Sequence, residues 1–137
     1  MQQTEVPQAS AVLERSMAES QGIGDIDSTE QGSAARFNAG KVDFSLLPLT
    51  TVVDELKVWE FGKKKYKAWN WAKGMPWSAP YNSLMRHMMA WQAGEDLDPE
   101  SGLPHLTHAM CNLRMLVLYS STYKDGDDRP TFLKDTL

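Results

Sequence analysis

Hydrophobic positions recur at helical spacing in three segments between residues 51 and 122. In the first segment, Val52, Leu56 and Trp59 fall on one face, which predicts an amphipathic helix. Thr51 stands three residues before a carboxylate, a pattern typical of a helix start, so we expect this helix to open at Thr51 and to run to Tyr66.

The second segment, residues 79–93, is apolar around most of its circumference, and Ser78 is its expected N-terminal cap. Its large apolar side chains include Leu84, Met85, Met88, Met89 and Trp91. A helix of this kind either lies at the centre of a core or packs against another subunit.

The third segment is predicted to be a helix from about Leu103 to Thr122, with Leu106, Met110, Leu113 and Val117 on its core face. No segment shows convincing strand alternation, so we predict an all-α fold, a bundle of about three main helices. Their apolar faces are too large for one small subunit, and we expect a homodimer or homotetramer to complete the bundle.

The first 35 residues differ from the rest of the chain. They contain no aromatic side chain, and six acidic residues against Arg15 give them a charge of −5. Such a segment buries too little apolar surface to offset its ordering entropy, so we interpret residues 1–35 as a flexible acidic tail. The helical domain is expected over residues 36–130, followed by a C-terminal extension over residues 131–137.

Length and charge narrow the classes of protein. The chain has 137 residues, a net charge of −4 and an isoelectric point near 5.3, which argues against general nucleic-acid binding. No apolar run is long enough to cross a membrane. The single cysteine, Cys111, suits a reducing compartment, so we expect a cytoplasmic protein. The charge and the absence of a long apolar run lead us to expect neither nucleic-acid nor membrane partners.

The candidate chemistry is concentrated within 22 residues. All three histidines, His87, His105 and His108, lie there with an acidic loop that contains Glu95, Asp98 and Glu100. A polar stripe beside a core face is how helical bundles build internal metal sites. We therefore assign these three carboxylates to a metal, and His105 or His108 to the metal or to proton transfer. Oxygen ligands favour Mg²⁺ or Mn²⁺, while imidazoles also admit Fe²⁺ or Zn²⁺. The alternative interpretation is that Asp98 and Glu100 merely start the third helix.

Other residues could bind a nucleotide. Lys65 and Arg86 could hold phosphates, and Trp71 could stack a purine whose edge Asn70 reads. Asp54 lies on the same helix stripe as Lys65 and could supply another metal carboxylate. The alternatives are that Asp54 belongs to the helix start, that Lys65 lies in a solvated basic run, and that Arg86 reaches solvent.

Several short motifs together resemble one protein family, the phage and bacterial dATP/dGTP diphosphohydrolase domain. The most specific of them lie between residues 94 and 108. The motifs are Phe61-Gly62, Lys65-Tyr66, Asn70-Trp71, Gly74, Trp77, Arg86-His87, Ala90-Trp91, Gly94-Glu95, Asp98 to Leu103, His105, His108-Ala109 and Asp127-Asp128-Arg129.

The resemblance implies kinship with the all-α nucleotide pyrophosphohydrolases of the MazG type. These use metals held by acidic residues to convert a nucleoside triphosphate into the monophosphate and pyrophosphate. It implies hydrolysis of dGTP or dATP in phage-type remodelling of the nucleotide pool, within the host cytoplasm if a phage encodes the chain. It also places Tyr66 and His87 among the substrate-binding residues. The alternatives are a non-catalytic nucleotide-binding or interaction protein with the same bundle, and a structural partner protein.

Overall fold

The structure is a computed structural model that describes residues 31 and 36–137. The predicted acidic tail, apart from residue 31, lies outside the described residues. The chain divides into two units, residues 1–47 and residues 48–137. In the first unit, a 3-10 helix η1 spans Phe44–Leu46, and the carboxylate of Asp43 accepts a hydrogen bond from the backbone N–H of Ser45 at 2.9 Å.

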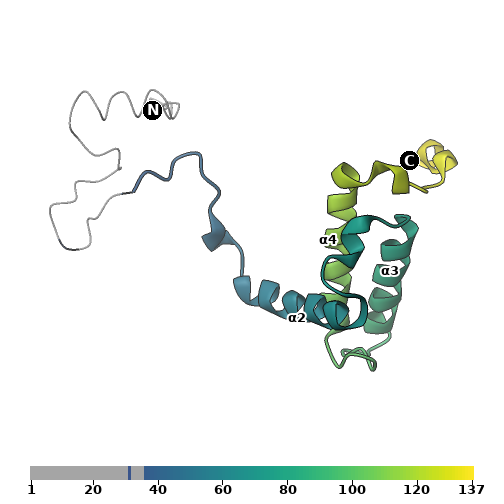
Figure 1. The fold of residues 1–137 in the computed structure, drawn as a ribbon, viewed down its shortest axis with the longest axis horizontal. Helices are drawn as coiled ribbons and strands as arrows, with labels where there is room; N and C mark the ends of the chain where they lie inside the picture. Colours follow the sequence, from purple (N-terminus) through teal and green to yellow (C-terminus); the bar gives the residue numbers. More distant parts are fainter. Residues whose placement is uncertain (1–30, 32–35) are drawn as a thin grey trace. The chain divides into compact units, whose positions relative to one another are not determined.

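The second unit contains three α-helices, α2 (Leu49–Tyr66), α3 (Ser78–Gln92) and α4 (His105–Thr122). Short 3-10 helices connect and follow them: η2 (Asn70–Lys73), η3 (Lys124–Gly126) and η4 (Thr131–Thr136). Helix α4 packs against both α3 and α2 (Figure 1). The described residues form no strand, and their β-pairing is a single isolated bridge between Leu97 and Pro104. The predicted all-α fold is confirmed.

The first helix begins two residues earlier than predicted. Pro48 is its N-terminal cap residue, and α2 starts directly after it at Leu49. The hydroxyl of Thr51 donates to the carbonyl of Pro48 at 2.7 Å, inside the first turn. The prediction that Thr51 opens the helix is therefore wrong: an extended proline already sets the boundary.

The start of α3 is held by a distant part of the chain. Ser78 is the first helical residue rather than the cap, and its backbone N–H donates to the carboxylate of Asp128 at 2.9 Å. The indole N–H of Trp77 donates to the carbonyl of Tyr123 at 2.9 Å. The prediction of a Ser78 cap is wrong, because a carboxylate 50 residues later meets that N–H.

The buried face of α4 is the polar stripe and not the apolar one. His105, His108, Cys111 and Tyr119 are buried, whereas Val117 on the predicted core face is 64% exposed. Leu106 and Leu113 are likewise exposed. The predicted core face of α4 is therefore wrong.

On helix α2, too, the buried face differs from the predicted apolar face. Leu56 is half exposed, while Glu55 and Val58 are buried. Burying a charged or polar side chain is tolerated only when its polar atoms have hydrogen-bond partners.

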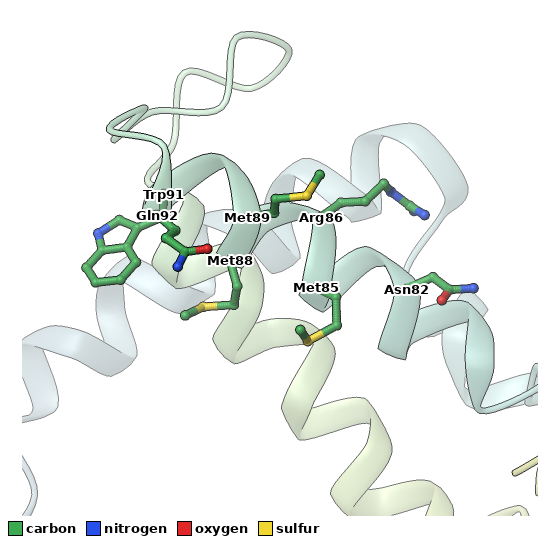
Figure 2. A pocket seen from close by; sticks show the side chains of 7 residues that line it. All are labelled: Asn82, Met85, Arg86, Met88, Met89, Trp91 and Gln92. Carbon is green, nitrogen blue, oxygen red and sulfur yellow. The ribbon is translucent and has the colours of Figure 1, made fainter.

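Apolar side chains also remain on the surface of α3. A hollow of about 610 Å³ is lined in part by Met85, Met88, Met89 and Trp91, whose side chains are drawn in Figure 2. Met89 is 66% exposed. Among the described helices, none has the length and apolar character required to span a bilayer.

The predicted homo-oligomer can be tested through this surface. We expect light scattering of the full chain at micromolar concentration to give a mass of at least a dimer, because association would cover the exposed methionines. Met89→Glu should lower that mass, and Leu133→Glu, which changes an exposed leucine in η4, should not. A monomeric unmodified chain would contradict the prediction.

Candidate functional site

The three histidines meet in one cluster. His87 comes from α3, and His105 and His108 come from the first turn of α4. The imidazoles of His87 and His108 are stacked with their centroids 4.4 Å apart. The Nδ1 atoms of His87 and His105 lie 2.8 Å apart, within hydrogen-bond distance. The spacing i, i+3 on α4 therefore places both helix-borne imidazoles against the same side chain of α3.

The loop between α3 and α4 is closed by its own hydrogen bonds. The carboxylate of Asp98 accepts from the backbone N–H of Ser101 at 3.0 Å and from its hydroxyl at 2.8 Å. Gly102 has a φ of +71°, which favours glycine at this turn. Asp98 thus stabilises a turn, and α4 begins seven residues later at His105, after Pro104. The interpretation of Asp98 as the cap of this helix is wrong, and the start predicted at about Leu103 is two residues early.

This loop supplies the partners that allow the imidazoles to be buried. Nε2 of His105 lies 2.7 Å from the carboxylate of Glu95, and Nε2 of His108 lies 2.7 Å from the hydroxyl of Ser101. Within the part of the chain that the structure describes, no buried side-chain nitrogen or oxygen lacks a hydrogen-bond partner. The polar face of α4 is therefore fully satisfied inside the protein.

At neutral pH the imidazoles of His87 and His108 are neutral and lie beside a negative Asp98 carboxylate. Burial lowers the pKa of His87, and the neighbouring His108 lowers it further. Burial also lowers the pKa of His108 and outweighs the opposing effect of Asp98. Partial burial raises the pKa of Asp98, but the hydrogen bonds from Ser101 outweigh it, so this pKa lies below the usual value.

These residues could hold a metal ion. One donor atom each from His87, Asp98 and His105 lies within 4.8 Å of the others. Two imidazoles and one carboxylate form a ligand set used by Mn²⁺, Fe²⁺ and Zn²⁺. The donor chemistry thus fits a divalent cation.

The other predicted metal ligands are placed differently. Glu95 contacts the cluster through His105, and Glu100 forms an ion pair with Lys65 at 2.6 Å. Asp54 pairs with Lys57 at 3.2 Å on an exposed part of α2. It is not among the residues that converge on the histidines.

One open cavity of about 890 Å³ joins most of the remaining candidates. The predicted substrate-binding residues that line it are Lys65, Tyr66, Asn70, Trp71 and His87. The predicted catalytic residues that line it are Asp98, Glu100 and His108. Arg86 lies elsewhere, beside the methionines in the hollow of Figure 2. Glu95, His105 and Asp54 do not line the cavity.

Aromatic side chains form one wall of this cavity. The ring of Trp71 lies 5.2 Å from that of Trp59 and 6.0 Å from that of Trp69. Trp69 is 73% exposed and has a left-handed backbone with φ of 63°, which is uncommon for a side chain of this size. The buried hydroxyl of Tyr119 donates to the carbonyl of Trp71 at 2.5 Å and anchors η2 to α4.

The cavity contains an ion pair that sequence reasoning missed. Glu55 is only 2% exposed, and Nε of Arg114 donates to both of its carboxylate oxygens, at 3.0 and 2.8 Å. Both residues line the cavity. They are 59 positions apart, on α2 and α4, and no local pattern links them. The only available signal was a charged residue at a position that helical spacing places beside Val58.

Comparison with known proteins gives two matches. Residues 31–129 match the family described as "dATP/dGTP diphosphohydrolase, N-terminal". A protein of Salmonella phage PMBT28 named "dATP/dGTP diphosphohydrolase" is 28% identical over 94 residues. The aligned region covers 69% of this chain and 32% of that protein, so the chain spans about a third of the length of this relative. No solved structure matches the chain.

The ion pair between buried Glu55 and half-exposed Arg114 should be important for stability. We expect Arg114→Met to destabilise the protein by about 1–3 kcal/mol in urea unfolding, because it leaves the Glu55 carboxylate buried without its partner. Lys57→Met, which breaks the exposed pair with Asp54, should cost only about 0–1 kcal/mol. The double variant Glu55→Met/Arg114→Met should recover most of the loss. Equal effects of the two single variants would contradict this assignment.

The anchor of η2 can be tested in the same way. We expect Tyr119→Phe to cost about 0.5–1.5 kcal/mol in urea unfolding, a typical net value for one hydrogen bond. The cost stays modest because the Trp71 carbonyl also accepts from the N–H of Gly74. Tyr81→Phe, which removes an exposed hydroxyl, is the matched control and should have no measurable effect.

Proposed function

Since the chain belongs to the dATP/dGTP diphosphohydrolase N-terminal domain family, we propose that it hydrolyses purine deoxynucleoside triphosphates, dGTP or dATP, to the monophosphate and pyrophosphate. The reaction would depend on a divalent metal ion, Mg²⁺ or Mn²⁺. The single observation that carries this proposal is the cavity of about 890 Å³, because it combines three kinds of groups that such a reaction requires. These are aromatic surfaces for a base, cations for phosphates, and a cluster of imidazoles and carboxylates.

The base would bind at the aromatic wall. Trp69 offers an exposed ring, and Trp71 offers a half-buried one beside the amide of Asn70. Stacking on such rings suits any purine, and an amide can donate to and accept from a base edge. Tyr66 lines the same cavity and adds a further aromatic surface.

The phosphates would bind at the cationic groups of the cavity. Lys65 is paired with Glu100, but both side chains are substantially exposed, so this pair contributes little to stability and exchanges easily. Arg114 is held at its Nε by Glu55, and its side chain is half exposed. A guanidinium oriented in this way can donate its other N–H groups to a phosphate.

The proton would be taken by a histidine. When bound, the metal ion would supply charge neutralisation for the triphosphate and activation of water. Water adds to the α-phosphorus, the bond to the bridging oxygen breaks, and pyrophosphate leaves. His108 is the best-placed base, because its imidazole is neutral and lines the cavity, whereas His105 is enclosed between His87 and Glu95.

A second candidate function is nucleotide binding without hydrolysis. It is favoured by the ion pairs that engage Glu55 and Glu100 and so leave few unpaired carboxylates along the cavity. The chain also spans only about a third of its phage relative. Calorimetry with dGTP and metal would then show binding, while the nucleotide stays intact on long incubation.

The proposed activity can be measured directly. We expect purified full-length chain with Mn²⁺ or Mg²⁺ to convert dGTP or dATP into the monophosphate and pyrophosphate, separated by ion-exchange chromatography. Asp98→Asn should reduce turnover by orders of magnitude, because it removes an anion and keeps an oxygen that can accept from Ser101. Glu100→Gln should also reduce turnover.

The matched control is Asp135→Asn, which removes the same charge from an exposed site in η4. It should leave turnover and melting temperature unchanged. Intact nucleotide after long incubation at high protein concentration would refute hydrolysis. Near-normal turnover in both carboxylate variants would refute the assignment of the reaction to this cavity.

A further inference from the structure

The contact between His87 and His105 has the geometry of a shared ligand site. Their Nδ1 atoms are 2.8 Å apart, and one donor atom each of His87, Asp98 and His105 lies within 4.8 Å of the other two. Two nitrogens bound to one tetrahedral Zn²⁺ would be about 3.3 Å apart, given Zn–N bonds of about 2.0–2.1 Å. A small separation of the two rings would therefore accommodate an ion.

Glu95 determines which nitrogen of His105 can bind. Its carboxylate accepts from Nε2 at 2.7 Å, and a carboxylate can only accept, so Nε2 carries the hydrogen. In the neutral imidazole, Nδ1 then has a free lone pair that points towards His87. A carboxylate that fixes the tautomer of a ligating histidine is a common arrangement around protein-bound metals. The lone pair on Nδ1 of His87 becomes available when Nδ1 loses its hydrogen to water and Nε2 gains one from water instead.

We propose that His87, Asp98 and His105 form a three-donor site for a borderline transition-metal ion, from Mn²⁺ to Zn²⁺, in preference to Mg²⁺. Mg²⁺ demands octahedral oxygen coordination, whereas two imidazoles and one carboxylate leave an open position on a nitrogen-rich site. His87 and Asp98 also line the cavity, so an ion held by them would be accessible from the space assigned to the nucleotide. The link to hydrolysis rests on the proposed function, but binding of the ion does not.

Within this site, Glu95 is a positioning residue. It is half exposed and reaches the site only through His105, so it is not itself a ligand. His108 is not part of this site, although its ring stacks on that of His87, because its nitrogens are not among the donor atoms that converge from His87, Asp98 and His105. This division distinguishes the proposal from a site formed by all the acidic residues of the loop.

The experiment uses tag-free full-length chain and the metals alone. We expect titration calorimetry to show one Zn²⁺ or Co²⁺ per chain, and Mg²⁺ at the same concentration to give no heat of binding. Co²⁺ should also give visible absorption bands of a site with nitrogen ligands. His87→Gln and Asp98→Asn should each weaken Zn²⁺ binding by at least tenfold, and Glu95→Gln by about 10- to 100-fold.

Two variants serve as controls. His108→Gln removes an imidazole from the same cluster and should retain the stoichiometry and the Co²⁺ spectrum. Asp135→Asn should be unchanged. Because His105 is buried, His105→Gln is interpreted only if its melting curve is normal, and the half-buried His87 provides the second variant. Zn²⁺ binding that survives His87→Gln, or Mg²⁺ binding as tight as Zn²⁺ binding, would overturn the proposal.

The outcome is independent of the activity measurement. Zn²⁺ or Co²⁺ binding without hydrolysis of any deoxynucleotide would leave the metal site in place and refute the proposed function. Hydrolysis with Mg²⁺ in a chain that binds neither Zn²⁺ nor Co²⁺ would refute the metal site and leave the function in place.

Discussion

The burial of imidazoles on one face of α4 is the constraint on which the rest of the structure depends. His105 and His108 are 4% and 7% exposed, and a polar ring at this depth is tolerated only with hydrogen-bond partners. Those partners come from α3 and from the loop that follows it. The self-bonded turn at Asp98 is thus required to bring Ser101 to His108. The same requirement turns the more apolar face of α4 outward.

Because the polar face of α4 is buried and its more apolar face is exposed, the sequence predicted the positions of the helices better than which of their faces are buried. The three helices follow from periodic apolar residues and were predicted within a few residues. Periodicity, however, identifies a core face only if apolar residues occupy it. On α4 the buried stripe includes two histidines and Thr107, while Leu113 and Val117 face outward. Which stripe is buried depends on partners from other elements, and no pattern within the helix carries that information.

The candidate site was predictable where its members are close in sequence. The histidines and the acidic loop stand within 22 residues, and their clustering was sufficient to predict a shared site. The pair of Glu55 and Arg114 joins two helices across 59 positions, and Arg86 lines the hollow beside the methionines of α3 instead of the cavity. Such placements depend on how α2 and α3 cross α4, which is a property of packing rather than of local sequence.

The hydrogen bond between Asp128 and Ser78 has a consequence for the order of events during synthesis. The ribosome completes α3, which bears His87, about 36 residues before it adds the carboxylate that caps its first turn. The nascent helix is therefore synthesised before the Asp128 carboxylate can accept a hydrogen bond from its first turn. The C-terminal segment packs against it last. A chain interrupted between residues 123 and 128 would contain every histidine of the cluster and still lack the cap of the helix that presents His87 to it.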